Sequence, residues 1–104
     1  MQELALSGNP LLNEGIIKVF RGLAIAKSLE MVYLNDCQWS DDTDVMAAMK
    51  MAMTKNTVLG KYDLKHNSIS EEGIDELCEI IKEAKHVNMI GMSEFISGEA
   101  MTKL

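Results

Sequence analysis

One stretch of this sequence occurs three times and begins a fourth time. Its clearest copy, Leu59 to Ile69, has apolar residues at its first, fourth, sixth and eleventh places and Asn67 at the ninth. Six residues after Asn67 comes Gly73, and an amphipathic run follows. Aligning the copies superposes sixth-place residues that are 28, 30 and 28 positions apart: Leu6, Leu34, Leu64 and Met92. Such a period predicts an array of stacked repeats.

The other columns of this alignment are also consistent in chemistry. The first column reads Met1, Leu29, Leu59 and Val87, and the fourth reads Leu4, Val32, Tyr62 and Ile90. The ninth column reads Asn9, Cys37, Asn67 and Phe95, and the eleventh reads Leu11, Trp39 and Ile69. Agreement across this many columns at one period is improbable by chance.

Each copy divides into a strand and a helix. In residues 4–6, 32–34 and 62–64 the first and third residues are apolar and the middle residue faces the other way, which predicts strands with one face inward. Spacings of three and four follow, and they predict helices near residues 14–26, 42–54 and 71–85. Three polar residues, Asn13, Ser40 and Ser70, are placed as N-caps, and acids follow them.

A unit of this size cannot bury its own apolar face, but stacked units bury a shared core. We therefore predict an α/β fold, a right-handed solenoid with a parallel sheet on one side and helices on the other. It forms a single domain over residues 1–104, with repeats at approximately 1–28, 29–58 and 59–86 and a partial repeat at 87–104.

The order L-x-x-L-x-L-x-x-N/C-x-L, followed by Gly and an amphipathic helix, resembles the ribonuclease-inhibitor type of leucine-rich repeat. Relatives of that type include the Ran GTPase-activating protein and the C-terminal domain of tropomodulin. The resemblance implies a horseshoe arc of about three and a half repeats, with strands on the concave face, helices on the convex face and protein partners on the concave face.

The chain departs from this pattern at Tyr62, where Leu is usual, at Thr43, where Gly is usual, and at Phe95, where Asn or Cys is usual. Solenoids require covered ends, and no polar cap precedes Leu4. The chain is therefore expected to be a fragment of a longer array or a small subunit whose ends a neighbour covers. The Phe95 ring is expected to close part of the C-terminal end.

Composition excludes several classes of function. A net charge of −6 leaves no basic patch for nucleic acid or an anionic membrane. Two cysteines in an ordinary core composition indicate a reducing compartment, and we expect a cytoplasmic protein. The N-terminus lacks the pattern of a secretory signal.

The residue types that could bind a metal or take part in catalysis have structural explanations. Asn9 and Asn67 are expected to satisfy backbone groups at the strand exits, and Cys37, Cys78 and Trp39 to lie in the core. The two histidines, His66 and His86, fall on different surfaces, so we predict no metal site. Asp41 to Asp44 are expected to complement the dipole of a helix rather than to bind a cation. Phosphate-binding and nucleophile-elbow motifs are absent, so no cofactor and no enzymatic activity are predicted.

The outward face of the strands is the remaining candidate site. It carries an aromatic residue among mixed charges, which is typical of a binding hot spot, although scattered exposed side chains are common on any surface. The candidate partner-binding residues are Met31, Tyr33, Lys61, Asp63, Lys65 and Met89.

These observations favour a non-enzymatic protein-interaction module or a small subunit docked in a larger assembly. Association with further copies through the uncapped ends is also expected. The resemblance implies two alternatives. A small-GTPase activator would need a longer arc than this chain supplies. An actin-filament-end binder of the tropomodulin kind is suggested by the run from Thr54 to Thr57.

Overall fold

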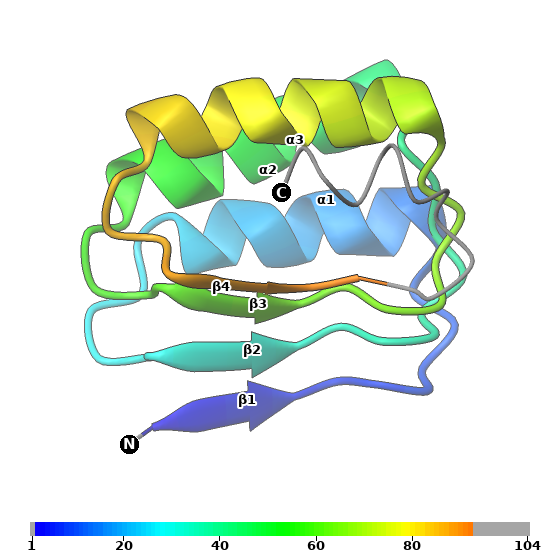
Figure 1. Ribbon diagram of the computed structural model, residues 1–104. Coiled ribbons are helices and arrows are strands. Elements are labelled where there is room, and N and C mark those ends of the chain that lie inside the picture. The colour runs from blue at the N-terminus through cyan, green and yellow to red at the C-terminus, as the bar shows by residue number, and fades with distance from the viewer. Residues whose placement is uncertain (1, 93–104) are drawn as a thin grey trace.

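The computed structural model describes residues 2–92 and contains one parallel sheet covered on one face by helices. The elements, in chain order, are β1 (Glu3–Ala5), α1 (Leu12–Leu23), β2 (Met31–Tyr33), α2 (Thr43–Lys55), β3 (Lys61–Asp63), α3 (Glu71–Glu83) and β4 (Met89–Gly91). The sheet order is β1-β2-β3-β4, and all three neighbouring pairs are parallel. Figure 1 shows the helices side by side on one face of the sheet. The predicted alternation of strands and helices in an arc of stacked repeats is therefore confirmed.

The inward columns of the alignment form the core beneath the sheet. Val32, Leu34, Tyr62 and Leu64 are all buried, as their alternation with outward residues predicts. Tyr62 fills the place of the usual Leu with a ring, and its hydroxyl has no hydrogen-bond partner within residues 2–92. Burial raises the pKa of this phenol far above its usual range, because the surrounding side chains solvate a phenolate poorly.

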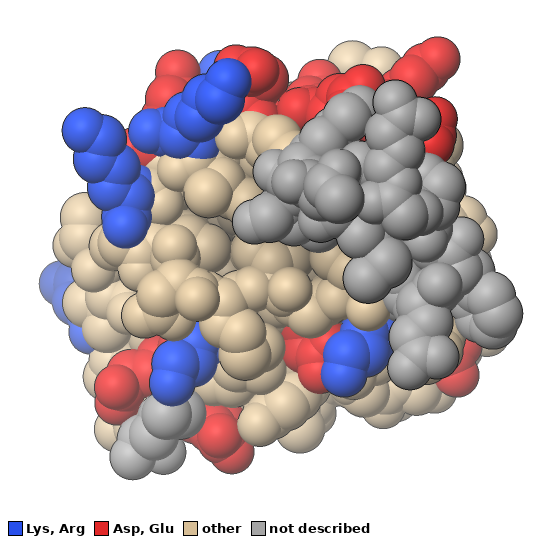
Figure 2. Space-filling view, viewed as in Figure 1, with Lys and Arg blue, Asp and Glu red and all other residues tan. Residues whose placement is uncertain are grey.

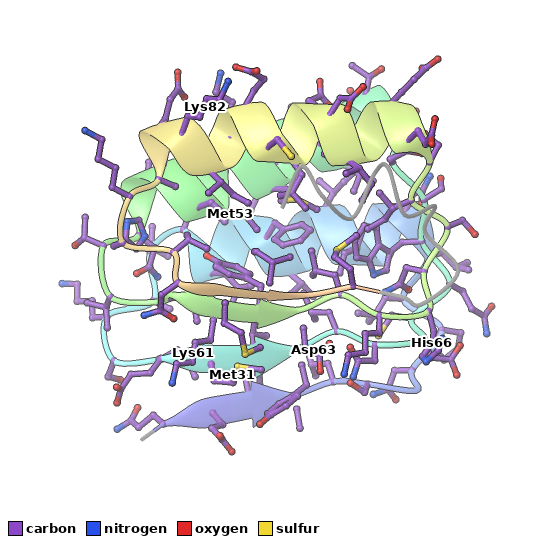
Figure 3. The ribbon with its side chains drawn as sticks, viewed as in Figure 1. Met31, Met53, Lys61, Asp63, His66 and Lys82 are labelled. Carbon is purple, nitrogen blue, oxygen red and sulfur yellow. The ribbon has the colours of Figure 1, made fainter. Side chains whose placement is uncertain are left out.

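The helices contribute the other half of the core. Met49 and Met53 of α2 are fully buried between their neighbours, and in Figure 3 Met53 lies between the ribbons of α1 and α2. Trp39 is also buried, and its ring meets that of Phe20 edge to face, with the centroids 6.1 Å apart. Most of the methionines in α2 therefore fill the core, where their pliable side chains adapt to an irregular space.

Helix boundaries differ from the prediction by a few residues, and two predicted caps are wrong. Ser70 caps α3, since its Oγ accepts a hydrogen bond from the Gly73 N–H at 3.3 Å. The N-cap positions of α1 and α2 are instead Leu11 and Asp42, and neither makes a side-chain capping bond. The first helix ends at Leu23, because the following turn tightens into bonds to carbonyls three residues back.

Asn13 and Ser40 bond to each other instead of capping helices. The Asn13 Oδ1 accepts the Ser40 N–H at 2.8 Å, and its Nδ2 donates to the Ser40 Oγ at 3.1 Å. The same link recurs one repeat later, where the Asp41 carboxylate accepts from the Ser70 N–H at 3.3 Å and from the Ser70 Oγ. Asp41 therefore reaches the beginning of α3, and only Asp44 lies in the first turn of α2. The assignment of the whole acidic run to the dipole of α2 is wrong.

The ninth column supports the strand exits as predicted. The Asn67 Oδ1 accepts the Cys37 N–H at 2.9 Å, and its Nδ2 donates to the Leu34 carbonyl at 2.8 Å. Cys37 is buried, whereas Cys78 is partly exposed rather than a core residue. The predicted role of Phe95, together with the rest of residues 93–104, lies outside the described residues.

Candidate protein-binding surface

The strand register arranges the outward side chains of the sheet in two rows. We call the sheet surface opposite the helices the strand face. Its first row contains Glu3, Met31, Lys61 and Met89, and its second contains Ala5, Tyr33, Asp63 and Gly91. The rows form because paired residues of parallel strands project to the same side. In Figure 3, Met31, Lys61 and Asp63 lie on the side of the sheet away from the helices.

Lys61 lies between two methionines in the first row. Met31 on one side is only 4% exposed, whereas Met89 on the other side is 37% exposed. Lys61 itself is half-buried, and its ammonium makes no ion pair within residues 2–92. This arrangement combines a thioether surface with an accessible positive charge, and aliphatic lysine stems cover such surfaces readily.

Tyr33 is the aromatic residue of the second row. Its hydroxyl donates a hydrogen bond to the Glu3 Oε2 at 3.3 Å. The negative charge of Glu3 raises the pKa of the Tyr33 phenol, with smaller contributions from burial, from that hydrogen bond and from Asp63. Tyr33 therefore keeps its proton and presents a half-exposed ring with a polar end, a combination suited to protein contacts.

Asp63 is a buried carboxylate on the strand face that contacts residues of both neighbouring strands. The residue is 7% exposed, its Oδ2 accepts from the Asn35 Nδ2 at 3.1 Å, and the Lys65 ammonium lies 3.9 Å from the same oxygen. The Oδ1 rests over Gly91 and has no hydrogen-bond partner within residues 2–92. A Cβ built on Gly91 would lie 2.9 Å from the Asp63 Cγ, so this packing requires glycine.

The structure separates the six sequence-predicted residues into two layers. Tyr33, Lys61, Lys65 and Met89 are accessible, whereas Met31 and Asp63 lie beneath them. His66, also outward in the sequence pattern, is exposed at the right-hand end of the strands in Figure 3. It adopts a φ of 59°, and the equivalent residues Gly8 and Asp36 share this left-handed conformation.

Sequence reasoning missed the role of Asn35. Its Nδ2 binds Asp63, its Oδ1 accepts the Lys65 N–H at 3.1 Å, and its own N–H donates to the Ser7 Oγ at 3.0 Å. One side chain and its backbone therefore connect the ends of three successive strands. A polar residue in the seventh column of every copy was the available signal, because residues one repeat apart become neighbours in a solenoid.

The described residues contain no group of three or more potential metal ligands. Within the same residues, every helix is too short or too polar to cross a bilayer.

The fold is an arc of strand–helix repeats that presents a curved strand face. It is similar to the actin-binding site 2 of leiomodin-1, with a TM-score of 0.82 and 16% identity over 99% of this chain and 59% of that chain. The human NACHT, LRR and PYD domains-containing protein 5 is 31% identical over 84 residues, which are 80% of this chain and 7% of that protein. No protein-family model matches the chain.

The chain is therefore a leucine-rich-repeat-type domain. Domains of this type are typically protein-binding and usually non-catalytic. This chain spans only a small part of the human relative and somewhat more than half of the leiomodin domain.

Proposed function

We propose that this chain is a non-enzymatic protein-binding module that recognises a partner through the concave strand face. The observation that carries the proposal is the placement of Tyr33 and Lys61 on a packed support. Both contact residues lie on strands, Tyr33 on β2 and Lys61 on β3, and the side chains of Met31 and Asp63 fill the layer beneath them.

The support favours binding because little freedom remains to be lost. Hydrogen bonds of Asn35, one of them to Asp63, link the ends of three successive strands at one side of the face. Side chains that are already held contribute more net affinity than mobile ones, since ordering on binding costs about 0.5–1.5 kcal/mol for each long side chain. Tyr33 supplies the apolar anchor, Lys61 and Lys65 add positive charge from the neighbouring strand and its exit, and Met89 adds thioether surface one strand farther on.

The composition of the face also indicates the kind of partner. Accessible charge is positive at Lys61 and Lys65, whereas Glu3 lies at the edge beside Tyr33. We therefore expect a partner surface with an apolar contact for Tyr33 and carboxylates opposite the two lysines. The free cysteines fit a cytoplasmic setting.

A site-specific photocrosslinker tests this proposal. With p-benzoylphenylalanine in place of Lys61, crosslinking in a cell extract should give a discrete protein adduct that disappears when Tyr33→Ala is added. The same photocrosslinker at Lys18, on the exposed face of α1, is the matched control and should give no such adduct. Adducts from Lys18 alone, or a Lys61 adduct insensitive to Tyr33→Ala, would contradict the proposal.

Actin is a second candidate partner, and the structural similarity to the actin-binding site 2 of leiomodin-1 favours it. At 16% identity this similarity concerns the fold. Co-sedimentation with filamentous actin is the direct test: the wild-type chain should pellet and the Lys61→Glu variant should remain in the supernatant. A chain that stays in the supernatant at all actin concentrations removes this candidate.

Docking within a larger assembly, or association with further copies, is a compatible form of the same function. Light scattering after size-exclusion chromatography measures the mass directly. A mass above that of the monomer, at 11.6 kDa, would support association. A monomer that no partner shifts would weigh against the docked form.

A further inference from the structure

A second surface of the molecule lies at the edge where helices end and strands begin. The α1–β2 and α2–β3 turns enclose a hollow of about 320 Å³ there, lined by residues 24–27 and 55–58. This edge is distinct from the strand face, because none of the hollow's residues belongs to a strand. Two repeats contribute equally to the hollow, so it exists only in the stacked structure.

Two aliphatic side chains at this hollow are exposed. Ile25 is 76% exposed and Val58 is 47% exposed, and each comes from a different turn. Covering such exposed side chains is favourable, at about 25 cal/mol for each Å² of apolar surface removed from water. Together they offer a contact for one apolar side chain of a partner.

The buried Asn56 holds the two turns in place. Its Nδ2 donates to the Leu23 carbonyl at 2.6 Å and to the Ala26 carbonyl at 2.9 Å. Its Oδ1 accepts the Val58 and Leu59 N–H groups, both at 2.8 Å. Both walls of the hollow are therefore preorganised, and binding would order little additional backbone.

The charge at the hollow is positive, although the chain as a whole carries −6. Lys27 and Lys55 line it, and no carboxylate of residues 2–92 does. Neither lysine makes an ion pair or side-chain hydrogen bond within residues 2–92, whereas Lys18, Lys50 and Lys82 on the helices pair with glutamates. In Figure 2, Lys and Arg gather mostly on the left, on the side of these turns, and Asp and Glu extend along the top over α3.

Helix dipoles account for part of this charge but not for the aliphatic residues. Lys55 lies in the last turn of α2, where a cation is favourable. That effect gives no reason for Ile25 and Val58 to face solvent beside it.

We propose that this hollow is a second interaction surface that binds an acidic segment of a partner protein. A branched aliphatic side chain of that segment contacts Ile25 and Val58, and its flanking carboxylates pair with Lys27 and Lys55. The surface acts independently of the strand face, so the two can bind different segments at once.

A short synthetic peptide with a central Leu between Asp and Glu residues tests the proposal by NMR titration of the ¹⁵N-labelled chain. Amide shifts should be confined to residues 24–27 and 55–58 and their immediate neighbours. Ile25→Ser should weaken binding by about tenfold or more, and the double variant Lys27→Glu with Lys55→Glu should abolish it. Affinity should also fall as salt rises, because exposed ion pairs are screened.

The matched control is Leu12→Ser, which removes another exposed aliphatic residue, 53% exposed, outside the hollow. It should leave peptide affinity unchanged, as should Tyr33→Ala on the strand face. Thermal melts should match the wild type for Ile25→Ser and Leu12→Ser, whose substituted side chains are exposed. Tyr33→Ala and the double lysine variant should stay folded with a small loss of stability, because the first loses a hydrogen bond to Glu3 and the second places an anion in the last turn of α2. Persistent binding by Tyr33→Ala also separates this proposal from the one for the strand face.

Several outcomes would overturn the proposal. The proposal is wrong if the acidic peptide does not bind, or if the amide shifts fall on the strand face. It is also wrong if a peptide with Ala in place of the central Leu, or with Lys in place of the acidic residues, binds equally well. Binding to phosphatidylserine-containing vesicles without binding to the peptide would identify a lipid surface instead, and would equally overturn it.

Discussion

Asp41 and Gly73 belong to neighbouring repeats and are in direct contact. A Cβ built on Gly73 would lie 2.7 Å from the Asp41 Cβ, closer than real side chains approach. The Asp41 carboxylate bonds Ser70, whose Oγ in turn caps the Gly73 N–H. The glycine that opens the amphipathic run is therefore required because a carboxylate from the preceding repeat occupies the space of its side chain.

This contact predicts that Gly73→Ala lowers the free energy of unfolding by about 1–3 kcal/mol, the usual cost of overpacking. The matched control is Gly22→Ala in α1, where no non-neighbouring atom lies within 4 Å of an added Cβ. The control should raise stability by about 0.5–1 kcal/mol, since alanine favours helices. Urea unfolding followed by circular dichroism measures both. Equal effects of the two substitutions would contradict the contact, as would a failure of Asp41→Gly, which removes both the Cβ and the carboxylate, to reduce the cost of Gly73→Ala.

Asn56→Ala is expected to destabilise the chain by about 2–4 kcal/mol, because it leaves buried backbone groups without partners. The affected groups are the Ala26 carbonyl, the Val58 and Leu59 N–H groups and the Leu23 carbonyl, which keeps a bond from the Ala26 N–H. Asn9→Ala is the control, since Asn9 is exposed and its side chain makes a single hydrogen bond within residues 2–92, to the Leu6 carbonyl at 2.8 Å. Asn9→Ala should lower the free energy of unfolding by less than about 1 kcal/mol. Similar melting temperatures for the two variants would show that Asn56 does not hold the turns.

Leu64→Ala tests the inward column of the alignment. Leu64 is 1% exposed, so its truncation should cost roughly 2–5 kcal/mol, which on a small array is enough to prevent folding. Leu12→Ala, at an exposed position, should change stability by no more than about 0.5 kcal/mol. Thermal denaturation of the pair distinguishes a core residue from a surface one, and equal melting temperatures would contradict the burial of Leu64.

Tyr62→Phe is expected to leave stability unchanged or to raise it by up to about 1 kcal/mol. The hydroxyl of Tyr62 is buried without a partner in residues 2–92, and an unpaired polar group costs free energy on folding. Denaturant unfolding provides the measurement. A clear loss of stability would mean that the hydroxyl has a partner.

The Tyr62→Phe variant retains one tyrosine, so the ionisation of Tyr33 can be followed alone by tyrosinate absorbance. Its midpoint should lie above the ordinary value of about 10, and Glu3→Gln should lower it by removing the adjacent negative charge. A raised pKa means that the folded state holds the proton more tightly than the unfolded state. The resulting stability is present below pH of about 10 and is lost as pH rises through the folded-state pKa. A midpoint that Glu3→Gln does not move would show that the two side chains do not interact.

The repeat period predicted most of the architecture because it reports burial directly. Val32, Leu34, Tyr62 and Leu64 recur at fixed intervals since each must face the same core. The same logic led to Asn67, because the three members of its column within residues 2–92, Asn9, Cys37 and Asn67, all donate to a carbonyl at a strand exit. The caps were predicted less well: Asn13 and Ser40 look like N-cap residues in the local sequence, but each finds a better partner in the other.

The candidate site was predictable in outline and not in depth. Alternation along the strands placed Met31 and Asp63 outward, and the structure agrees. The alternation does not reveal that both side chains are covered by their neighbours on adjacent strands. Cover of this kind depends on residues 28 to 30 positions away in the chain, so no local pattern contains it.

By itself, the sequence determined the repeat, the direction of each strand's apolar side and the approximate helices, because periodicity and hydrophobicity act locally. The tertiary structure alone decided which polar residues meet across repeats: Asn35 with Asp63, Asp41 with Ser70, and Asn56 with the first turn. It also decided that Ile25 and Val58 line one hollow. The physical reason is that stacking brings together side chains that are distant in the chain. Whether two such side chains form a hydrogen bond depends on how neighbouring repeats are placed, which the sequence pattern within one repeat does not contain.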